Sequence, residues 1–310
     1  DFRLADLVTL NLHRFAEDVE TIVDRASKER NMERNLKTLD ETWKDLHFTY
    51  GVYKDGKLPL LQVDEDLVEV LEDNQVLVQN MAASKYVAHF QEEIQRWQKS
   101  LATVDTNMQT WLEVQQNWSH LEPIFIGSAD IRAQLPEDSA RFDRIDADWR
   151  AMMDHAKEET KAIVVATEKG MSERLENLET ELAKCEKALA DYLETKRRAF
   201  PRFYFISATA LLDILSKGQQ PIEMQEHLIK LFGNIHHLDW EMDEEGNPTK
   251  NAIGIYSKEN EYLPMKNPCA CVGVVEEWLN SLVDSMRESM HQVLQEAIID
   301  YGESEYIPWM

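Results

Sequence analysis

The chain has 310 residues and carries 33 basic against 58 acidic side chains, which leaves a net charge of −25. A surface of this sign repels phosphate backbones and anionic membranes, so neither nucleic-acid binding nor membrane binding is expected. Only 10 Gly and 9 Pro interrupt the backbone, and this composition favours long helices and a mainly α fold.

Cysteine usage and hydropathy indicate a soluble intracellular chain. Cys185, Cys269 and Cys271 are too few and too unevenly spread for a disulfide framework, so a reducing cytosolic compartment is expected. No apolar run approaches the ~20 residues that cross a bilayer. The first residues, DFRLADLV, lack the pattern of a cleaved signal. Both ends lie within a continuing pattern, as the ends of an excised fragment would.

Residues 1–122 are predicted to form a helical bundle that includes one small hairpin. Apolar side chains recur every three or four positions from Leu4 to Leu46, with a break near Arg30 and Asn31. This spacing predicts either a pair of helices or one bent helix.

The hairpin is predicted over residues 48–63. The dipeptide Asp55-Gly56 stands between two apolar arms, which is the strongest short-range signal for a hairpin turn. Pro59 cannot donate a backbone hydrogen bond, so the second arm should lie at the edge of its sheet.

Two longer helices complete this bundle in the prediction. The first extends from Glu65 to Ala82, and the second follows a four-three stripe from Val87 to Leu121 and ends at Pro123. The second helix would span on the order of 55 Å at ~1.5 Å per residue. Tryptophans that share the helical stripes with Leu and Ile are expected in the core. They are Trp97, Trp111, Trp118 and Trp149.

Residues 123–200 are predicted to form a second helical bundle. Residues 124–136 indicate a loop with one short turn, and Pro136 suits the first position of the next helix. From Met171 to Tyr192 the apolar residues keep a heptad spacing. This helix is expected to end before Pro201.

Residues 201–310 show shorter and more mixed patterns. The turn-rich stretch Asp243–Lys250 predicts a β-hairpin near residues 235–263, with a third strand at Tyr262–Leu263. Helices are predicted around this hairpin at residues 208–216, 222–232 and 272–301. The expected fold is thus mainly α, an elongated array of helical bundles with one or two small β-hairpins.

No catalytic or nucleotide-binding residues are expected in this chain. A phosphate-binding loop needs a glycine-rich turn that ends in Lys and Ser or Thr, and the pattern GxxxxGK[ST] does not occur. Acidic runs such as Glu158-Glu159 are typical of solvated faces rather than of acid–base pairs.

The cysteine and histidine patterns do not predict a metal site. Cys269 and Cys271 follow the pair His236-His237, and thiolates with imidazoles are the usual zinc ligands. The CxC spacing is tighter than that of structural zinc sites, and Pro268 suits a helix entrance, so a packing role is expected. We therefore expect no metal and no cofactor.

Several stretches resemble signatures of the dynein heavy-chain linker. The longest are LEPIFIGSADIRAQLPEDSARFDRID, from Leu121 to Asp146, and DYLETKRRAFPRFYFIS, from Asp191 to Ser207. Shorter matches occur in family order along nearly the whole chain, among them LEDNQVLVQNM, GIYSKENEYLPM and VEEWLNSL. LEDNQ together with HLEPIFIGS resembles the axonemal type, closest to the β class of outer-arm heavy chains.

The resemblance implies a mechanical role. In this family the linker is an arch of helical bundles across a ring of AAA+ modules, and it bends with the nucleotide state of the ring to drive the power stroke. The implied partners are the AAA+ ring of the same heavy chain and, through a tail outside this chain, other dynein subunits. No direct microtubule contact is expected, because the family's microtubule-binding tip lies elsewhere. The implied localisation is the cytoplasm and cytoskeleton, in the axoneme of a cilium or flagellum.

Two kinds of working segment are predicted on this basis. A lever must meet the ring, and the acidic turn of the second hairpin is a candidate ring contact, formed by Asp243, Glu244 and Glu245. A lever must also bend where the helical pattern is weak, at residues 124–136 and 198–202. The candidate hinge residues are Pro123, Gly127, Pro136 and Pro201.

A passive scaffold is the alternative. Long helices with Trp43 and Trp149 spaced as in a spectrin-like array also suit a rod, of spectrin or tail type, that only binds partner chains. The residues around the two tryptophans do not match one another, and the ordered family signatures favour the linker.

Overall fold

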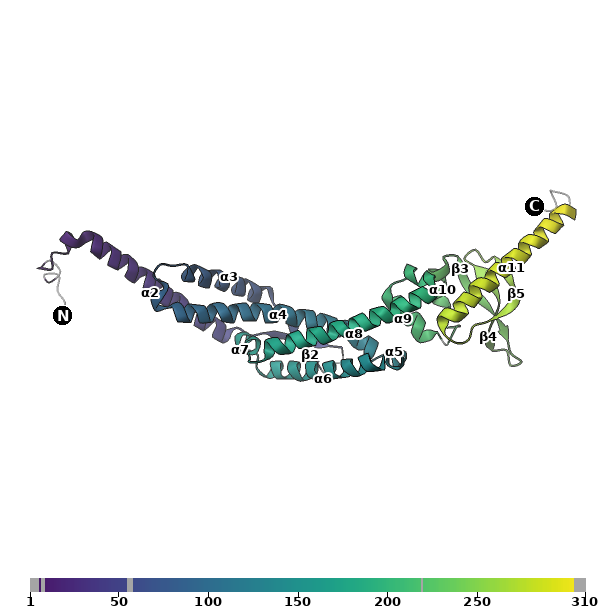
Figure 1. The fold of residues 1–310 in the computed structure, drawn as a ribbon, viewed down its shortest axis with the longest axis horizontal. Helices are drawn as coiled ribbons and strands as arrows, with labels where there is room; N and C mark the ends of the chain where they lie inside the picture. Colours follow the sequence, from purple (N-terminus) through teal and green to yellow (C-terminus); the bar gives the residue numbers. More distant parts are fainter. Residues whose placement is uncertain (1–5, 7–8, 55–57, 219, 304–310) are drawn as a thin grey trace. The chain divides into compact units, whose positions relative to one another are not determined.

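The structure is a computed structural model that describes residues 6, 9–54, 58–218 and 220–303. Helices account for most of these residues, and two small antiparallel sheets accompany them, so the predicted mainly α class is confirmed (Figure 1). None of the helices in these ranges has both the length and the hydropathy needed to span a membrane.

The chain divides into two compact units. Unit 1 comprises Asp1–Ile124 and Ser139–Lys184, and unit 2 comprises Phe125–Asp138 and Cys185–Met310. The finer division predicted from the sequence, into residues 1–122, 123–200 and 201–310, stays a prediction.

Unit 1 begins with the 3-10 helix η1 (Leu12–Phe15) and the single helix α2 (Ala16–Asp45). α2 passes through Arg30 and Asn31 without interruption, so of the two predicted alternatives the pair of helices is wrong and the single helix is confirmed. An interior Asn costs a helix at most ~0.7 kcal/mol relative to Ala, which is too little to end it. The buried residues of α2 all lie in its second half, and they are Met32, Leu36, Leu39 and Trp43.

The next elements confirm the predicted hairpin and the two helices after it. In chain order they are β1 (Thr49–Tyr53), β2 (Leu58–Gln62), α3 (Glu65–Ala82), η2 (Val87–His89) and α4 (Gln91–Phe125). β1 pairs antiparallel with β2, and the predicted turn residues Asp55 and Gly56 lie outside the described residues. α4 continues past its predicted end at Pro123, because the fully buried Phe125 anchors one more half-turn.

One glutamine of α4 completes the hydrogen bonding of the hairpin. Gln115 Oε1 accepts from the backbone N–H of Leu61 at 2.8 Å, and Gln115 Nε2 donates to the carbonyl of Leu61 at 3.0 Å. The side-chain amide thus pairs with β2 as a neighbouring strand would. A two-stranded ribbon is only marginally stable by itself, so this pair helps to hold it on α4.

Four further helices follow in the middle of the chain. They are α5 (Ala129–Gln134), α6 (Pro136–Glu158), α7 (Ala162–Ala166) and α8 (Met171–Ala199). Pro136 is the first residue of α6, and α8 ends before Pro201, as predicted. The predicted loop at 124–136 is wrong in part, because it contains α5, whose Ser128 side chain caps the helix by accepting from Ile131 N–H.

Trp118 lies at the centre of the core of unit 1. It is fully buried, its ring stacks on that of Trp149 with centroids 5.9 Å apart, and the Tyr53 ring meets its edge at 5.0 Å. Trp118 Nε1 donates to Asp146 Oδ1 at 3.1 Å, and the guanidinium of Arg150 lies 5.5 Å from the ring centroid. These contacts join α4, α6 and the hairpin. The core positions predicted for all four stripe tryptophans are confirmed.

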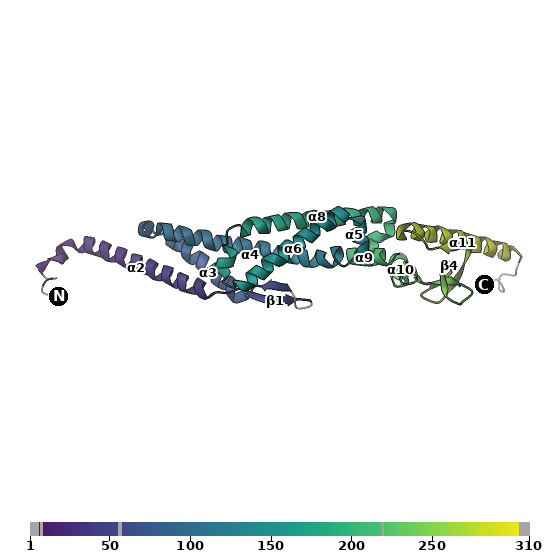
Figure 2. The same cartoon turned by 90° about the horizontal axis from the view of Figure 1, so that it is seen from below.

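Unit 2 is built from the end of α8 and the elements that follow it. They are η3 (Pro201–Phe205), α9 (Ala208–Lys217), α10 (Gln225–Phe232), β3 (Ile235–Met242), β4 (Pro248–Ser257), β5 (Tyr262–Ala270) and α11 (Val275–Glu303). The strand order is β3-β4-β5, and both pairings are antiparallel. α11 lies alongside this sheet in both views (Figures 1 and 2) and contacts β5.

β5 is longer than the short third strand predicted from the sequence. It contains Pro264 and Pro268, so the predicted helix entrance at Pro268 is wrong, and α11 starts at Val275 rather than at residue 272. Prolines are tolerated here because β5 is an edge strand that pairs only with β4. Its Cys269 side chain is buried, which gives this strand a place in the core.

Aromatic rings from the three strands contact one another across the sheet. His237 stacks on Tyr256 with ring centroids 4.5 Å apart, and Tyr256 meets Tyr262 at 4.8 Å. The Tyr262 hydroxyl donates to Asp239 Oδ2 at 3.1 Å. A Cβ at Gly254 would overlap the Tyr262 ring, so the absence of a side chain there makes room for the tyrosine.

Candidate functional site

The acidic turn between β3 and β4 uses its first carboxylate to hold its own shape. Asp243 Oδ1 accepts from the backbone N–H of Glu245 at 2.9 Å and of Asn247 at 2.8 Å. The bond from Asn247 is the main reason that the pKa of Asp243 is lowered from its ordinary value. Gly246 adopts a φ of 82°, which a residue with a side chain rarely takes. Asp243 is therefore a structural residue of the turn.

The other two predicted contact residues point their charge outward. Glu244 and Glu245 are exposed, and neither carboxylate forms an ion pair with a cation in the described part of the chain. The turn thus presents two adjacent negative charges on a fixed backbone. Of the three residues proposed as a ring contact, these two are available for one.

Three of the four predicted hinge residues lie around α5. Pro123 lies in the last turn of α4, where it cannot donate a helical hydrogen bond. Gly127 lies in the short connection between α4 and α5, and Pro136 opens α6. Within this segment, Arg132 Nη1 donates to the carbonyl of Phe125 at 3.1 Å and so caps the end of α4.

The fourth predicted hinge residue, Pro201, lies in a tightly packed corner. Phe200 and Phe203 on either side of it are buried, with ring centroids 5.0 Å apart. Arg202 Nη1 donates to the carbonyl of Leu231 at 3.2 Å, and its guanidinium lies 4.9 Å from the centroid of the Phe232 ring. Bending here would expose two phenylalanines, so we favour the segment around α5 as the hinge. The position of the hinge stays a prediction.

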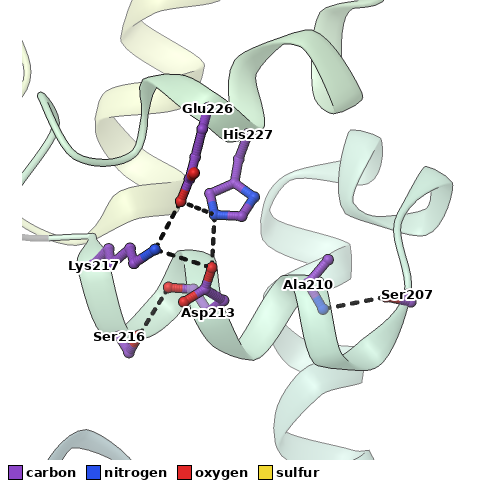
Figure 3. A network of polar contacts seen from close by, with 7 residues as sticks. All are labelled: Ser207, Ala210, Asp213, Ser216, Lys217, Glu226 and His227. Carbon is purple, nitrogen blue, oxygen red and sulfur yellow. Dashed lines mark hydrogen bonds and ion pairs between the residues drawn. The ribbon is translucent and has the colours of Figure 1, made fainter.

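A polar cluster that the sequence analysis did not single out joins α9 to α10 (Figure 3). Lys217 Nζ lies 3.2 Å from Asp213 Oδ2 and 2.7 Å from Glu226 Oε1, and His227 Nε2 lies 2.8 Å from Asp213 Oδ2. The Lys217 ammonium lowers the pKa of Glu226, and the bond to Glu226 raises the pKa of Lys217. Its only sequence signal was the Asp213–Lys217 spacing of four residues, which is common on helix surfaces.

The same cluster contains three side chains of metal-ligand type whose ligand atoms lie close together. Oxygen and nitrogen atoms of Asp213, Glu226 and His227 lie within 4.8 Å of one another. The ammonium of Lys217 already bridges the two carboxylates at hydrogen-bonding distance. A metal ion would have to displace it, so the arrangement suits an ion-pair network better than a metal centre.

The cysteines and histidines considered as zinc ligands have other contacts. Cys269 and Cys271 are buried, and the hydrogen bond from Cys271 lowers the pKa of the Cys269 thiol. His236 Nδ1 lies 2.9 Å from His237 Nδ1, and His237 stacks on Tyr256. Together they do not form a metal-ligand group in the described ranges. The expected absence of a metal and of a cofactor stays a prediction.

Comparison with known proteins identifies the family. The family model described as dynein heavy chain, N-terminal region 2, matches residues 1–297. The chain is a member of the dynein heavy-chain family. It is 50% identical over 308 residues to the ciliary dynein beta chain of Heliocidaris crassispina, and 47% identical over 310 residues to dynein axonemal heavy chain 9 of Homo sapiens. These matches cover 99% and 100% of this chain but only 7% of each relative.

The predicted class within the dynein heavy chains is also supported. The chain is 45% identical to the flagellar outer-arm beta chain of Chlamydomonas reinhardtii and 37% identical to the alpha chain of the same outer arm. The axonemal, outer-arm β-like assignment made from LEDNQ and HLEPIFIGS therefore agrees with these comparisons. The names of these relatives place them in cilia and flagella, as expected for an axonemal chain.

Proposed function

We propose that this chain is part of the linker of an axonemal dynein heavy chain and acts as a lever between the AAA+ ring and the tail. The parent heavy chain would be a microtubule motor ATPase of a cilium or flagellum. ATP-driven changes in its ring would move this lever and so produce the power stroke. The partners would be the ring of the same heavy chain and, through the tail, other dynein subunits.

Family membership in N-terminal region 2 supports this proposal, and one structural feature favours a lever over a passive rod. A rod that only binds partners needs helices, which α4 and α8 provide over 35 and 29 residues. It does not need a three-stranded sheet whose acidic turn is held rigid by Asp243. A rigid projecting turn suits repeated contact with a second surface, because little conformational entropy is lost on each contact.

Energy transfer within the whole motor tests the lever role. A donor fluorophore at Glu259, which is exposed in the β4–β5 turn, is paired with an acceptor on the AAA+ ring. A lever predicts that transfer efficiency differs between the nucleotide-free motor and the motor trapped with ATP and vanadate. A second motor with both fluorophores on rigid parts of the ring serves as the control. Unchanged transfer in every nucleotide state, in a motor that still hydrolyses ATP, would favour the passive scaffold.

The ring contact of the acidic turn is tested by removing its outward charges. In the whole motor, Glu244→Gln with Glu245→Gln is expected to lower microtubule gliding velocity roughly twofold, the scale of losing exposed charge pairs. Shortening the turn Asp243–Lys250 should act in the same direction. Basal ATP turnover should not change, because no nucleotide-binding residue is altered.

A matched pair of charges in the same sheet provides the control. Glu259→Gln with Glu261→Gln removes two exposed charges from the β4–β5 turn and should leave gliding velocity unchanged. If both pairs slow gliding equally, the effect is one of net charge and not of the turn. If neither the Gln pair nor the shortened turn slows a folded motor, the turn is not a working contact.

A further inference from the structure

The last helix of unit 2, α11, is packed along only one of its halves. In the first half Val275 and Leu279 are buried, and the helix contacts β5. The last buried side chain in the described part of the helix is Ser289, whose Oγ accepts from the backbone N–H of Lys266 in β5 at 2.9 Å. Beyond this contact α11 continues to Glu303, past the end of the sheet (Figure 1). The sheet therefore covers only the first half of the helix.

The second half of α11 keeps the apolar pattern of the first half but leaves it exposed. Four apolar residues at intervals of three, one and four positions lie on one side of the helix, and they are Met290, Val293, Leu294 and Ile298. Their exposed fractions are 59%, 43%, 58% and 63%. We call these four side chains the bare stripe. Val293 follows the buried Leu279 by 14 residues, which is close to four whole turns, so the bare stripe continues the buried side of the helix.

The polar side chains of the second half are paired with one another. Gln292 Nε2 donates to Glu296 Oε1 at 2.8 Å, and Gln295 Nε2 lies 3.0 Å from His291 Nε2. These contacts join residues four positions apart and do not involve the bare stripe. In proteins, most of the stability of a helix comes from packing of its apolar face. The apolar side of this half is therefore the side that lacks a packing partner among the described residues.

The charge of this half argues against a second copy of the chain as the packing partner. From Glu288 to Glu303 the sequence contains no Lys or Arg, whereas Glu288, Glu296 and Asp300 are acidic. Two copies that paired along the bare stripe, in either direction, would bring acidic side chains together without a basic residue between them. Flanking charges of one sign on both helices disfavour such a pair. The partner is thus a different segment.

We propose that the bare stripe is covered by an amphipathic helix from the part of the heavy chain that follows these 310 residues. The matching family model is described as an N-terminal region, and this chain covers only 7% of each relative. Most of the sequence of each relative therefore follows the matched region. A segment of the same polypeptide reaches the bare stripe at a high effective concentration. α11 is then a helix shared by two packed parts of the heavy chain. The inference rests on family membership and does not depend on the lever proposal.

Hydrogen exchange in the isolated chain and in the purified whole heavy chain tests this packing. The backbone amides from Met290 to Ile298 should exchange at least about tenfold more slowly in the heavy chain, because the stripe is buried there. Met290→Glu with Leu294→Glu should return these amides of the heavy chain to the rates of the isolated chain. In the isolated chain the same pair should leave thermal unfolding unchanged, since both side chains are exposed.

Ile299→Glu is the matched control. Ile299 is 61% exposed and follows Met290 by nine residues, or two and a half turns, so it lies on the opposite side of the helix. This substitution should leave the exchange rates unchanged in both proteins, and unchanged exchange in α8 verifies that each variant is folded. The proposal is overturned if the stripe amides exchange equally fast in both proteins. It is also overturned if the isolated chain protects them by forming a dimer, or if the heavy chain protects them only when other dynein subunits are bound.

Discussion

Replacing Trp118 by alanine is expected to lower the free energy of unfolding of unit 1 by about 3–5 kcal/mol. The side chain is fully buried and stacks on Trp149, so its removal leaves a cavity where α4, α6 and the first hairpin meet. It also leaves Asp146 without the hydrogen bond from Trp118 Nε1. Urea unfolding followed by circular dichroism, together with hydrogen exchange of the α6 amides, measures the loss.

Two further variants separate the causes of this effect. Trp118→Phe keeps an aromatic ring but loses the bond to Asp146, so its cost should be smaller. Phe15→Ala removes another aromatic ring from unit 1, but Phe15 is 56% exposed, and a cost within about 0.5 kcal/mol is expected. Equal stability of Trp118→Ala and Phe15→Ala would contradict a core centred on Trp118.

Replacing Lys196 by methionine should destabilise unit 2 by about 3–5 kcal/mol, the range found when one partner of a buried ion pair is removed. Lys196 Nζ lies 2.5 Å from Glu276 Oε1, so the substitution leaves the carboxylate of Glu276 buried in α11 without its cation. Thermal and urea unfolding of the purified variant measure this loss. The double variant Lys196→Met with Glu276→Leu should recover most of the stability, because two apolar side chains replace the pair without leaving a buried charge.

A more exposed ion pair of the same length provides the comparison. Lys184 Nζ lies 2.5 Å from Glu181 Oε1, and the two side chains are 55% and 27% exposed. Solvent screens such a pair, and Glu181 keeps its ion pair with Arg141, so Lys184→Met should cost no more than about 1 kcal/mol. If Lys196→Met costs as little as Lys184→Met, or if the double variant is no more stable than Lys196→Met, then burial does not govern the Lys196–Glu276 pair.

Long periodic segments were predictable because their signal is local. The bounds predicted for α3 are those of the structure. The heptad stripe that starts at Met171 forms the buried face of α8. In each case one buried face of a helix determines the pattern.

Short elements were missed or misplaced. α5 and α7 have only six and five residues, too few for a periodic stripe, and the length of β5 depends on its pairing with β4.

The candidate site shows the same division between local and tertiary information. An acidic turn was predictable from composition, but the different roles of Asp243 and Glu244 follow from hydrogen bonds to the turn backbone. The cluster at Asp213 brings together charges from two helices, and the Lys196–Glu276 pair joins residues that are 80 positions apart in the sequence. Neither arrangement leaves a spacing that a single sequence reveals.

The sequence by itself determined the mainly α class, the position of the long helices and of both hairpins, and the dynein heavy-chain family. These features depend on apolar periodicity, turn residues and ordered motifs, each of which is contained in a continuous stretch of chain. Only the tertiary structure decided which charges are buried in pairs and which of the predicted hinge residues is packed into a core. Burial and pairing depend on which segments meet in space, and that contact sets the free energy of each polar group.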